Sequence, residues 1–232
     1  MPTRLAGLVF DAEEPAVLAQ FWSDLLRWPV TATAGDVVAL TPSAEDGFHG
    51  DLTFVRGARP KAGVNRWHLD LPSVSEADQL ALVDRAVSLG ARRVDIGQGE
   101  RPWVVLADPE DNEFCVLEPR PEYADTGAVA AVVLLSADPS ALVGFLAEAT
   151  GHLIVRDAPP VASLRAADGR GPWLELLASA EPKRSRNRLR LDLVAEGPLR
   201  VEVDRLLAQG ARRVGDGLCD PEGNEFQVAA PV

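Results

Sequence analysis

Few side chains in this sequence of 232 residues could bind a metal ion or attack a substrate through an imidazole or a thiolate. The sequence contains three histidines and two cysteines, which are His49, His68, His152, Cys115 and Cys219. The cysteines do not have the spacing of a metal-binding motif, and two thiols do not build a disulfide framework. Serine triads, phosphate-binding loops and dinucleotide fingerprints are absent. The residue types alone therefore point to no standard catalytic motif.

The composition is that of an ordinary globular protein, with 47% hydrophobic and 25% charged residues. The formal net charge of −12 argues against nucleic acid as a partner, because phosphate binding requires a basic surface. No run of about 18 apolar residues could span a membrane, and residues 1–4 lack the apolar core of a signal peptide. We therefore expect a cytoplasmic monomer or homodimer with a small-molecule ligand and with no nucleic-acid or membrane partner.

A nine-residue stretch that occurs twice reveals how the chain is organised. Residues 108–116 read DPEDNEFCV, and residues 220–228 read DPEGNEFQV. Each stretch predicts a tight turn, because proline fixes φ and asparagine or glycine tolerates the left-handed conformation, followed by an alternating strand. A second stretch recurs in the same order, since NRWHLDL at 65–71 returns as NRLRLDL at 187–193. The sequence is therefore a tandem duplication.

The duplication predicts two homologous domains, at residues 1–120 and 126–232, joined by the polar linker 121–125. In each domain the hydrophobic pattern predicts a strand, a helix and three strands, and this order then repeats. The second domain is shorter before its last turn. We therefore expect an α+β fold of four βαβββ modules in two domains.

The starts of two helices carry recognisable signals. Asp11–Pro15 places acids and a proline in a first turn, as the helix dipole and the missing proline N–H favour. Ser73 and Glu76 have the spacing of a capping box for a helix that stops at Gly90. Near residues 212–218 one strand is expected before the final turn.

Three features together carry a family resemblance: the two Asp-Pro turns, the helix phrase AQFWSDLL at 19–26, and the strand at 65–71. With these the chain resembles the glyoxalase-like branch of the vicinal oxygen chelate superfamily. That superfamily includes glyoxalase I, extradiol dioxygenases, fosfomycin-resistance proteins and bleomycin-binding proteins. The resemblance covers both halves of the chain. It implies that two βαβββ modules face each other and that their curved sheets enclose a cleft for a small molecule.

The resemblance also implies a divalent metal ion, held by histidine or glutamate side chains from four inward-facing strand positions. Strand alternation places these positions approximately at Gly7, Thr53, His68 and Cys115 in the first domain, and at Ala131, Glu175, Arg190 and Gln227 in the second. Only His68 and Glu175 match the expected ligand types, one in each domain. One ligand cannot hold such an ion. We therefore predict no metal cofactor, and an ion pair between Glu175 and Arg190 in the second cleft.

The first domain is predicted to carry the ligand site. Thr53, His68 and Cys115 are expected to face its cleft, with Trp103 on the neighbouring strand, and this mixture of polar and aromatic groups is typical of small-molecule pockets. The predicted ligand is a small apolar or aromatic molecule, bound for sequestration or resistance in the manner of bleomycin-resistance proteins. The alternative is a metal-dependent lyase, isomerase or dioxygenase with a nonstandard ligand set that uses His68, together with Cys115 and Asp70.

Each candidate also has a purely structural interpretation. Trp103 could merely pack against its neighbours, and His68 with Cys115 could be a hydrogen-bonded core pair. Trp22 and Trp28 are candidates for the rim of the cleft. Nucleophilic catalysis by Cys115 is disfavoured, because its strand position offers no helix N-terminus to lower the thiol pKa. The sequence leaves open whether the protein is an enzyme.

Overall fold

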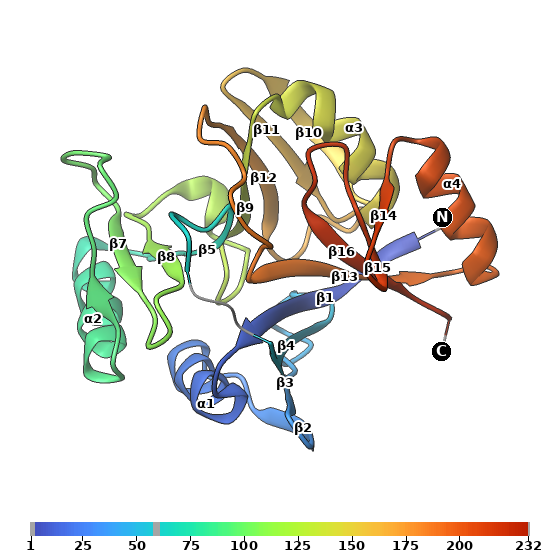
Figure 1. Cartoon of the computed structure of the whole chain (residues 1–232). Helices are drawn as coiled ribbons and strands as arrows, with labels where there is room; N and C mark the ends of the chain where they lie inside the picture. The colour runs from blue at the N-terminus through green and yellow to red at the C-terminus, as the bar shows by residue number, and fades with distance from the viewer. Residues whose placement is uncertain (1–2, 58–60, 232) are drawn as a thin grey trace.

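The structure is a computed structural model that describes residues 3–57 and 61–231. The outermost residues of the two expected domains, 1, 2 and 232, lie outside the described part. The described helices and strands form four βαβββ modules, which we number one to four in chain order (Figure 1).

The modules have the following elements. Module one consists of β1 (Thr3–Ala12), α1 (Pro15–Leu26), β2 (Val30–Ala34), β3 (Val37–Leu40) and β4 (Asp51–Arg56). Module two consists of β5 (Trp67–Leu71), α2 (Glu76–Ser88), β6 (Arg92–Arg93), β7 (Val104–Ala107) and β8 (Glu113–Val116), and the short 3-10 helix η1 (Pro121–Tyr123) follows it. Module three consists of β9 (Ala131–Ser136), α3 (Pro139–Thr150), β10 (Leu153–Ala158), β11 (Val161–Arg165) and β12 (Trp173–Ala178). Module four consists of β13 (Leu189–Ala195), α4 (Leu199–Ala208), β14 (Arg212–Val214), β15 (Gly217–Cys219) and β16 (Glu225–Ala229).

The four modules form two eight-stranded sheets, and each sheet takes one module from each half of the chain. Sheet A joins modules one and four in the order β14-β15-β16-β13-β1-β4-β3-β2. Sheet B joins modules two and three in the order β10-β11-β12-β9-β5-β8-β7-β6. At the sheet centres, β1 pairs antiparallel with β13 and β5 pairs antiparallel with β9. The expectation that each half of the chain encloses its own cleft is therefore wrong, because the strands pair across the halves.

Alternation along the strands separates a core-facing side from an opposite side in each sheet. In β5, Trp67, Leu69 and Leu71 belong to the main hydrophobic core, whereas His68 and Asp70 point to the other side. All four helices contribute apolar side chains to this core. The burial of one face thus fixes the direction in which the polar strand residues point.

Among the described residues, no helix is long and apolar enough to cross a bilayer.

The two predicted Asp-Pro turns are built alike. Asp108 accepts a 2.9 Å hydrogen bond from the backbone N–H of Asn112, and Asp220 accepts one of 2.8 Å from the backbone N–H of Asn224. Trp22 of α1 adds a 3.1 Å hydrogen bond from its Nε1 to the carboxylate of Asp108. The first turn therefore also ties module two to module one.

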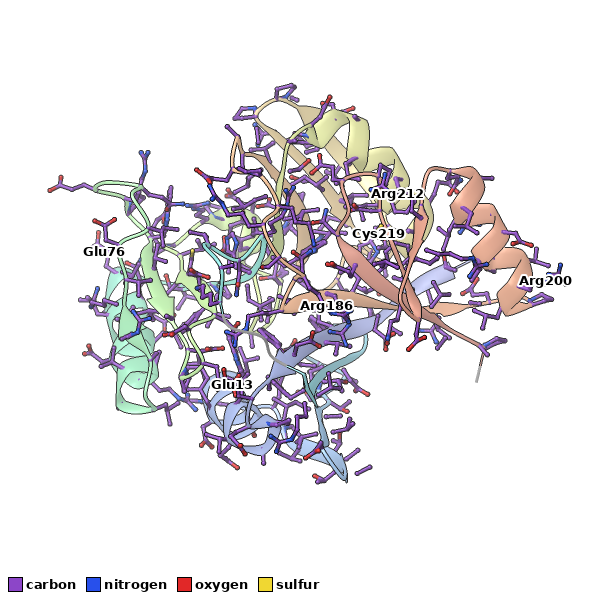
Figure 2. The ribbon with its side chains drawn as sticks, in the orientation of Figure 1. Glu13, Glu76, Arg186, Arg200, Arg212 and Cys219 are labelled. Carbon is purple, nitrogen blue, oxygen red and sulfur yellow. The ribbon has the colours of Figure 1, made fainter. Side chains whose placement is uncertain are left out.

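The glutamate of each turn binds the start of a helix that belongs to the other sheet. Glu110 accepts hydrogen bonds of 2.8 Å from the N–H groups of Glu13 and Glu14, just before α1. Figure 2 labels Glu13 beside this helix. Glu222 accepts one of 3.0 Å from the N–H of Asp138, just before α3. A carboxylate stabilises a helix start because the first N–H groups lack intrahelical partners and the helix dipole is positive there. The turns consequently link sheet A to sheet B.

Two helix starts differ from the sequence expectation. Asp11 belongs to β1, where it pairs with β4, and α1 begins only at Pro15. The helix α2 is capped by Ser75, whose hydroxyl accepts a 3.1 Å hydrogen bond from the N–H of Asp78. Ser73, the expected cap, instead donates to a backbone carbonyl of the chain beyond β8. Both helices are therefore shorter than the sequence pattern suggested.

Module four contains one strand more than expected before its final turn. Instead of forming a single strand, the segment 212–218 folds back on itself, so that β14 and β15 pair as a short hairpin. Gly215 makes the reversal possible, because its φ of 54° lies in the left-handed region that favours glycine. The last module thus keeps the same βαβββ plan as the other three.

Candidate ligand-binding site

A cleft opens on the side of sheet B that faces away from the hydrophobic core. Its volume is about 650 Å³, within the range of about 300–1,000 Å³ for ordinary small-molecule pockets. Modules two and three both line it, and the linker between them forms a further side. Its polar side chains include His68, Asp70, Cys115, Ser163 and Glu175, and its aromatic side chains are Trp103, Tyr123 and Trp173.

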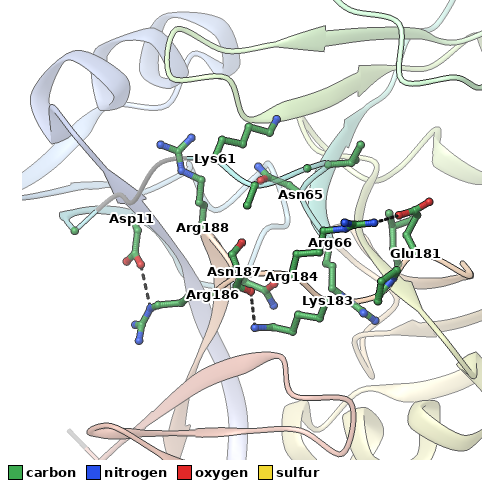
Figure 3. A pocket seen from close by; sticks show the side chains of 17 residues that line it. Asp11, Lys61, Asn65, Arg66, Glu181, Lys183, Arg184, Arg186, Asn187 and Arg188 are labelled. Carbon is green, nitrogen blue, oxygen red and sulfur yellow. Dashed lines mark hydrogen bonds and ion pairs between the residues drawn. The ribbon is translucent and has the colours of Figure 1, made fainter.

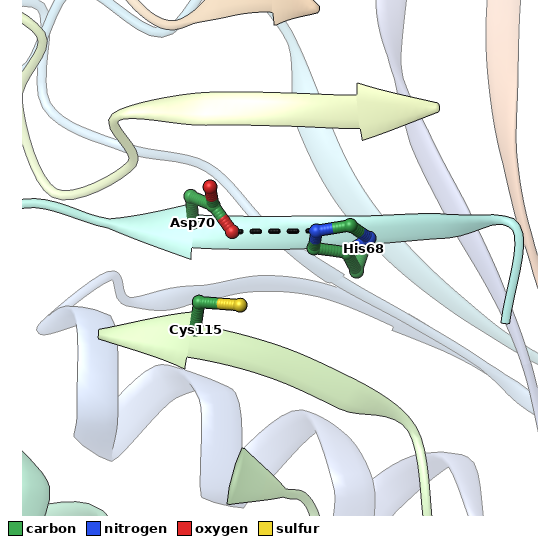
Figure 4. A group of neighbouring side chains, drawn as sticks. All are labelled: His68, Asp70 and Cys115. Carbon is green, nitrogen blue, oxygen red and sulfur yellow. Dashed lines mark ion pairs between the residues drawn. The ribbon is translucent and has the colours of Figure 1, made fainter. Parts of the chain in front are cut away.

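Three side chains of module two meet at the floor of this cleft (Figure 4). His68 and Asp70 lie two residues apart on β5, and Cys115 on the adjacent strand β8 pairs with Asp70. Nε2 of His68 lies 3.5 Å from Oδ1 of Asp70. The nitrogen, oxygen and sulfur atoms that these residues could offer to a ligand all lie within 4.8 Å of one another. Strand alternation and pairing thus bring His68 and Cys115 together.

Burial determines the protonation of these three groups. It lowers the pKa of His68 to about 4 and raises the pKa of Asp70 to about 7. The pKa of the Cys115 thiol is raised, first by burial and then by the nearby Asp70 carboxyl. Near neutral pH the floor therefore holds a neutral imidazole, a protonated thiol and a carboxyl group that is about half protonated. A thiol in this state is not an activated nucleophile.

Module three brings a second carboxyl group into the cleft. Glu175 of β12 accepts a 3.2 Å hydrogen bond from the hydroxyl of Tyr123 and lies 3.4 Å from the hydroxyl of Ser163. Burial raises the pKa of Glu175, although these two hydrogen bonds oppose the shift. Burial and the Glu175 carboxylate also raise the pKa of Tyr123, so its phenol keeps the proton that it donates. Burial thus raises the pKa of both Asp70 and Glu175.

The aromatic walls are held in place by polar contacts at their edges. Nε1 of Trp103 donates a 2.9 Å hydrogen bond to Gln98, and Nε1 of Trp173 donates one of 3.1 Å to a linker carbonyl. The guanidinium of Arg120 lies 5.6 Å from the ring centre of Trp103 and 5.9 Å from that of Tyr123. These are cation–π distances. The rings therefore have defined positions at the mouth of the cleft.

Two of the predicted site residues, Thr53 and Arg190, lie in sheet A and not at the sheet B cleft. Thr53 lies on β4 in sheet A, away from the sheet B cleft. The predicted ion pair between Glu175 and Arg190 is not formed, because β12 belongs to sheet B and β13 to sheet A. Arg190 instead pairs with Asp11, which is also 3.3 Å from Nε of Arg186. His68, Trp103, Cys115 and Glu175 therefore share one cleft, although they come from both halves of the chain.

The two other tryptophans that were expected near the rim belong to the core. Trp22 and Trp28 are 0% and 3% exposed, and both are packed in the main hydrophobic cluster. The Nε1 of Trp28 donates a 3.1 Å hydrogen bond to Asp46, which satisfies its buried donor. Their helical and loop positions are explained by packing alone.

Several cleft residues escaped the sequence analysis. Tyr123 lies in the linker and Arg120 directly before it, where no periodic pattern shows which way a side chain points. One signal was present, because Tyr123 is the single tyrosine of the chain. Trp173 could have been found by strand alternation, since it lies two residues before Glu175 on β12. Glu175 itself was recognised, but it was placed in the wrong cleft.

The family resemblance assigns four strand positions to metal ligands, and in sheet B these are occupied by His68, Cys115, Val133 and Glu175. Val133 pairs with both His68 and Glu175 across adjacent strands, so it replaces the approximate assignment to Ala131. Valine offers no ligand atom. Among the described residues, Glu175 does not belong to the group whose ligand atoms gather within 4.8 Å. The residues at these positions do not fit a divalent ion held in the way that the resemblance implies.

The corresponding positions in sheet A hold Val9, Thr53, Arg190 and Gln227. Val9 pairs with Thr53 and with Arg190, so it occupies the position that was approximately assigned to Gly7. Guanidinium, hydroxyl, amide and isopropyl groups do not make a site for such an ion either. The side chain of Arg190 is buried, whereas Gln227 is exposed. Sheet A thus presents a salt-bridged face at the place where sheet B presents a cleft.

The comparison with known proteins decides the family. The family model of the glyoxalase-like domain matches residues 7–117 and, a second time, residues 131–229. The chain belongs to this family. The two matches are the two copies of the tandem duplication, and each supplies one module to sheet A and one to sheet B. No curated protein matches the sequence.

Solved structures share the fold of this glyoxalase-like protein. Glyoxalase I from Zea mays is 15% identical, with 97% of this chain and 92% of that chain covered and a TM-score of 0.65. A putative dioxygenase from Bacillus subtilis is 14% identical, with 99% and 85% covered and a TM-score of 0.64. At these identities the similarity shows the fold alone. The predicted α+β fold, a tandem vicinal oxygen chelate fold of four βαβββ modules, is confirmed.

Proposed function

We propose that this glyoxalase-like protein binds a small apolar or aromatic molecule in the sheet B cleft, without a metal ion, and so sequesters it. The observation that carries the proposal is the cleft of about 650 Å³, whose walls include Trp103, Tyr123 and Trp173. Beneath them, Val133 and the protonated thiol of Cys115 stand at two of the positions that a metal site would need. The protein therefore has an open pocket for a small molecule but lacks a complete set of side chains to bind a metal ion in it.

The chemistry of the cleft favours a ligand that is flat and largely uncharged. Aromatic side chains stack on planar rings, and each such contact contributes about 0.5–1.5 kcal/mol beyond simple area burial. The pKa of Asp70 is raised to about 7, and a protonated carboxyl group both donates and accepts hydrogen bonds, whereas Glu175 accepts them from Tyr123. A phenol, a carbonyl group or an amide on the ligand would match them.

Binding can be tested with 1-naphthol as the probe and tryptophan fluorescence as the readout. We expect saturable quenching that EDTA does not change, because no metal ion takes part. The double variant Trp103→Leu with Trp173→Leu should bind about 10-fold more weakly, since it loses two stacking surfaces. Trp28→Phe is the matched control, because Trp28 lies in the core. Quenching that is absent, or equal in the double variant and the control, would refute the proposal.

The alternative function is a metal-dependent lyase, isomerase or dioxygenase with a nonstandard ligand set. It is favoured by one observation, the gathering of His68, Asp70 and Cys115 ligand atoms within 4.8 Å. Elemental analysis of protein purified without an affinity tag separates the two functions. We expect no stoichiometric zinc, nickel, manganese or iron. One metal ion per chain that is lost in His68→Ala would establish the alternative.

A further inference from the structure

A second, smaller pocket lies between the two loops that lead into β5 and β13 (Figure 3). We call it the loop pocket, and it is formed by residues 61–66 and 181–188 together with Asp11, Gly57 and Leu135. Its volume is about 90 Å³. Its basic side chains are Lys61, Arg66, Lys183, Arg184, Arg186 and Arg188, and its acidic ones are Asp11 and Glu181. Such a concentration of positive charge stands out in a chain whose formal net charge is −12.

The two lysines of the loop pocket form equivalent ion pairs in the two copies of the duplication. Lys61 pairs with Glu113, and Lys183 pairs with Glu225 at 2.8 Å. Each glutamate stands at the start of the strand that follows an Asp-Pro turn. Because both copies make the same contact, the folding of the loops explains these two lysines.

Two arginines of the second loop have no counterpart in the first. The offset between the loops is 183 − 61 = 122, and it places Ala62 and Val64 where the second loop has Arg184 and Arg186. The nearest acidic partner of Arg184 is Glu181 at 3.7 Å, and both of these side chains are more than 60% exposed. Exposed pairs of this kind contribute little to stability. The fold of the loop therefore does not account for Arg184.

The carboxylate Asp11 faces more positive charge than it can neutralise. One of its oxygens pairs with the buried Arg190, and the other lies 3.3 Å from Nε of Arg186. Figure 3 shows the contact between Asp11 and Arg186 at one side of the pocket. Asp192 also lies near Arg190, whereas Arg186 has only a share of the Asp11 carboxylate.

Arg188 is a second weakly compensated cation. It is 8% exposed, and the nearest carboxylate oxygen, on Glu13, is 3.9 Å away from its NH2. Its NH1 donates to a backbone carbonyl and to an amide oxygen, which carry no formal charge. Its Nε has no hydrogen-bond partner among the described residues. A buried guanidinium is costly unless an anion or several good acceptors satisfy it.

We propose that the loop pocket binds a small oxyanion, such as a phosphate or a carboxylate group, through Arg184, Arg186 and Arg188. Guanidinium groups recognise such groups with paired, charge-assisted hydrogen bonds. The small volume admits one oxyanion group but not a large organic ligand. The anion would supply the negative charge that Asp11 and Glu13 provide only in part.

The loop pocket is separate from the ligand cleft, although Leu135 lines both. Phosphate binding that depends on Arg184 and Arg186 tests the loop pocket, because these two arginines do not line the cleft. The quenching by 1-naphthol tests the cleft, and the two readouts can therefore succeed or fail independently.

The test is isothermal titration of the full-length protein with inorganic phosphate and with acetate, at constant ionic strength maintained with chloride. The diagnostic variant is Arg184→Ala with Arg186→Val, which introduces the residues that the first loop carries at the same positions. The control is Arg200→Ala with Arg213→Ala, which removes the same charge from exposed sites in module four. Figure 2 labels Arg200 on α4. Circular dichroism checks that each variant is folded.

We expect saturable binding of one anion per chain by the natural protein and by the control, and an affinity at least 10-fold lower in the diagnostic variant. Saturation by phosphate, by acetate or by both supports the proposal and tells which oxyanion is preferred. Absence of saturable binding of either anion, or equal affinity in the diagnostic variant and the control, would overturn it.

Discussion

Sheets A and B both contain the four strand positions that the family resemblance assigns to metal ligands, yet the two sheets carry different residues there. In sheet B these positions hold His68, Cys115, Val133 and Glu175, and they lie beside an open cleft. In sheet A the positions hold Val9, Thr53, Arg190 and Gln227, and a buried ion pair with Asp11 lies across them. Both sheets have a valine at the same position. The comparison shows that a sheet without the expected metal ligands can still have an open cleft, as sheet B does.

The two faces differ in how their buried polar groups are satisfied. In sheet B the burial of Asp70 and Glu175 shifts their pKa values toward the neutral form. In sheet A the buried Asp11 is stabilised by the guanidinium groups of Arg190 and Arg186. Neutral groups leave room for an uncharged ligand, whereas a buried ion pair needs its partner to stay in place. Substitutions on the two faces should therefore have different consequences.

The largest expected effect is the loss of the ion pair in sheet A. Arg190→Ala leaves the buried carboxylate of Asp11 without its main partner, and we expect a loss of about 3–5 kcal/mol in the free energy of unfolding. Urea denaturation measures it. Arg156→Ala, at the exposed rim of the sheet B cleft, is the matched control and should change stability by less than about 0.5 kcal/mol.

Replacing both charged residues of that ion pair should cost less than replacing one. The double variant Asp11→Leu with Arg190→Leu removes the buried carboxylate together with its buried partner, so the only charge left without Asp11 is the partly exposed Arg186. If Arg190→Ala lost less than about 1 kcal/mol, the ion pair would not stabilise the sheet A face.

The second effect is a pH dependence that belongs to sheet B. The pKa of Asp70 is raised from its usual value to about 7, so the unfolded chain loses this proton at a lower pH than the folded protein does. The ionisable Asp70 therefore lowers stability as the pH rises from about 4 to about 7. Asp70→Asn should remove this loss, so its stability relative to the natural protein should increase over that interval, by on the order of 3 kcal/mol.

The control for this measurement is the corresponding aspartate of sheet A. The pKa of Asp192 is raised by burial, and the guanidinium of Arg190 opposes the shift. Asp192→Asn should therefore show the same trend with a smaller size. The titration of His68 acts in the opposite direction, because burial lowers its pKa to about 4. It is present in both proteins that are compared, so it largely cancels in their difference. Equal pH profiles for Asp70→Asn and the natural protein would contradict the prediction.

The smallest effect is a gain of metal binding in sheet B. Val133→His places an imidazole between His68 and Glu175, on the cleft face that Cys115 also lines. Nickel or zinc should then bind and stabilise the variant by about 1–2 kcal/mol when the free ion is at about 10–30 times Kd. Elemental analysis and thermal unfolding with and without the ion measure it. Val9→His in sheet A is the matched control, and we expect no binding because its neighbours include Arg190.

The sequence predicted the modules well because their signals are local. The Asp108 and Asp220 turns repeat with their strands, and alternation along β5 correctly directed His68 and Asp70 away from the core. The pairing of modules was not predictable in this way. The hydrophobic pattern of a strand does not identify its partner, so the choice of β9 instead of another partner for β5 depends on contacts between distant segments.

That missing information explains the errors at the candidate site. Thr53 was assigned to the cleft of His68, and Glu175 to the cleft of Arg190, because residues of one half of the chain were taken to face each other. Tyr123 in the linker and Arg120 just before it were missed for a different reason. Irregular backbone gives no period from which the direction of a side chain can be read. The roles of these residues in ligand binding stay predictions.

The exchange of modules between the two halves has an evolutionary consequence. A protein made of one half alone would contain two incomplete sheets, and two identical copies would have to associate to complete both. Such an ancestor would carry two identical faces, and every mutation would alter both at once. Joining the copies in a single polypeptide releases the faces from this symmetry, so one can become a salt-bridged support while the other remains a receptor.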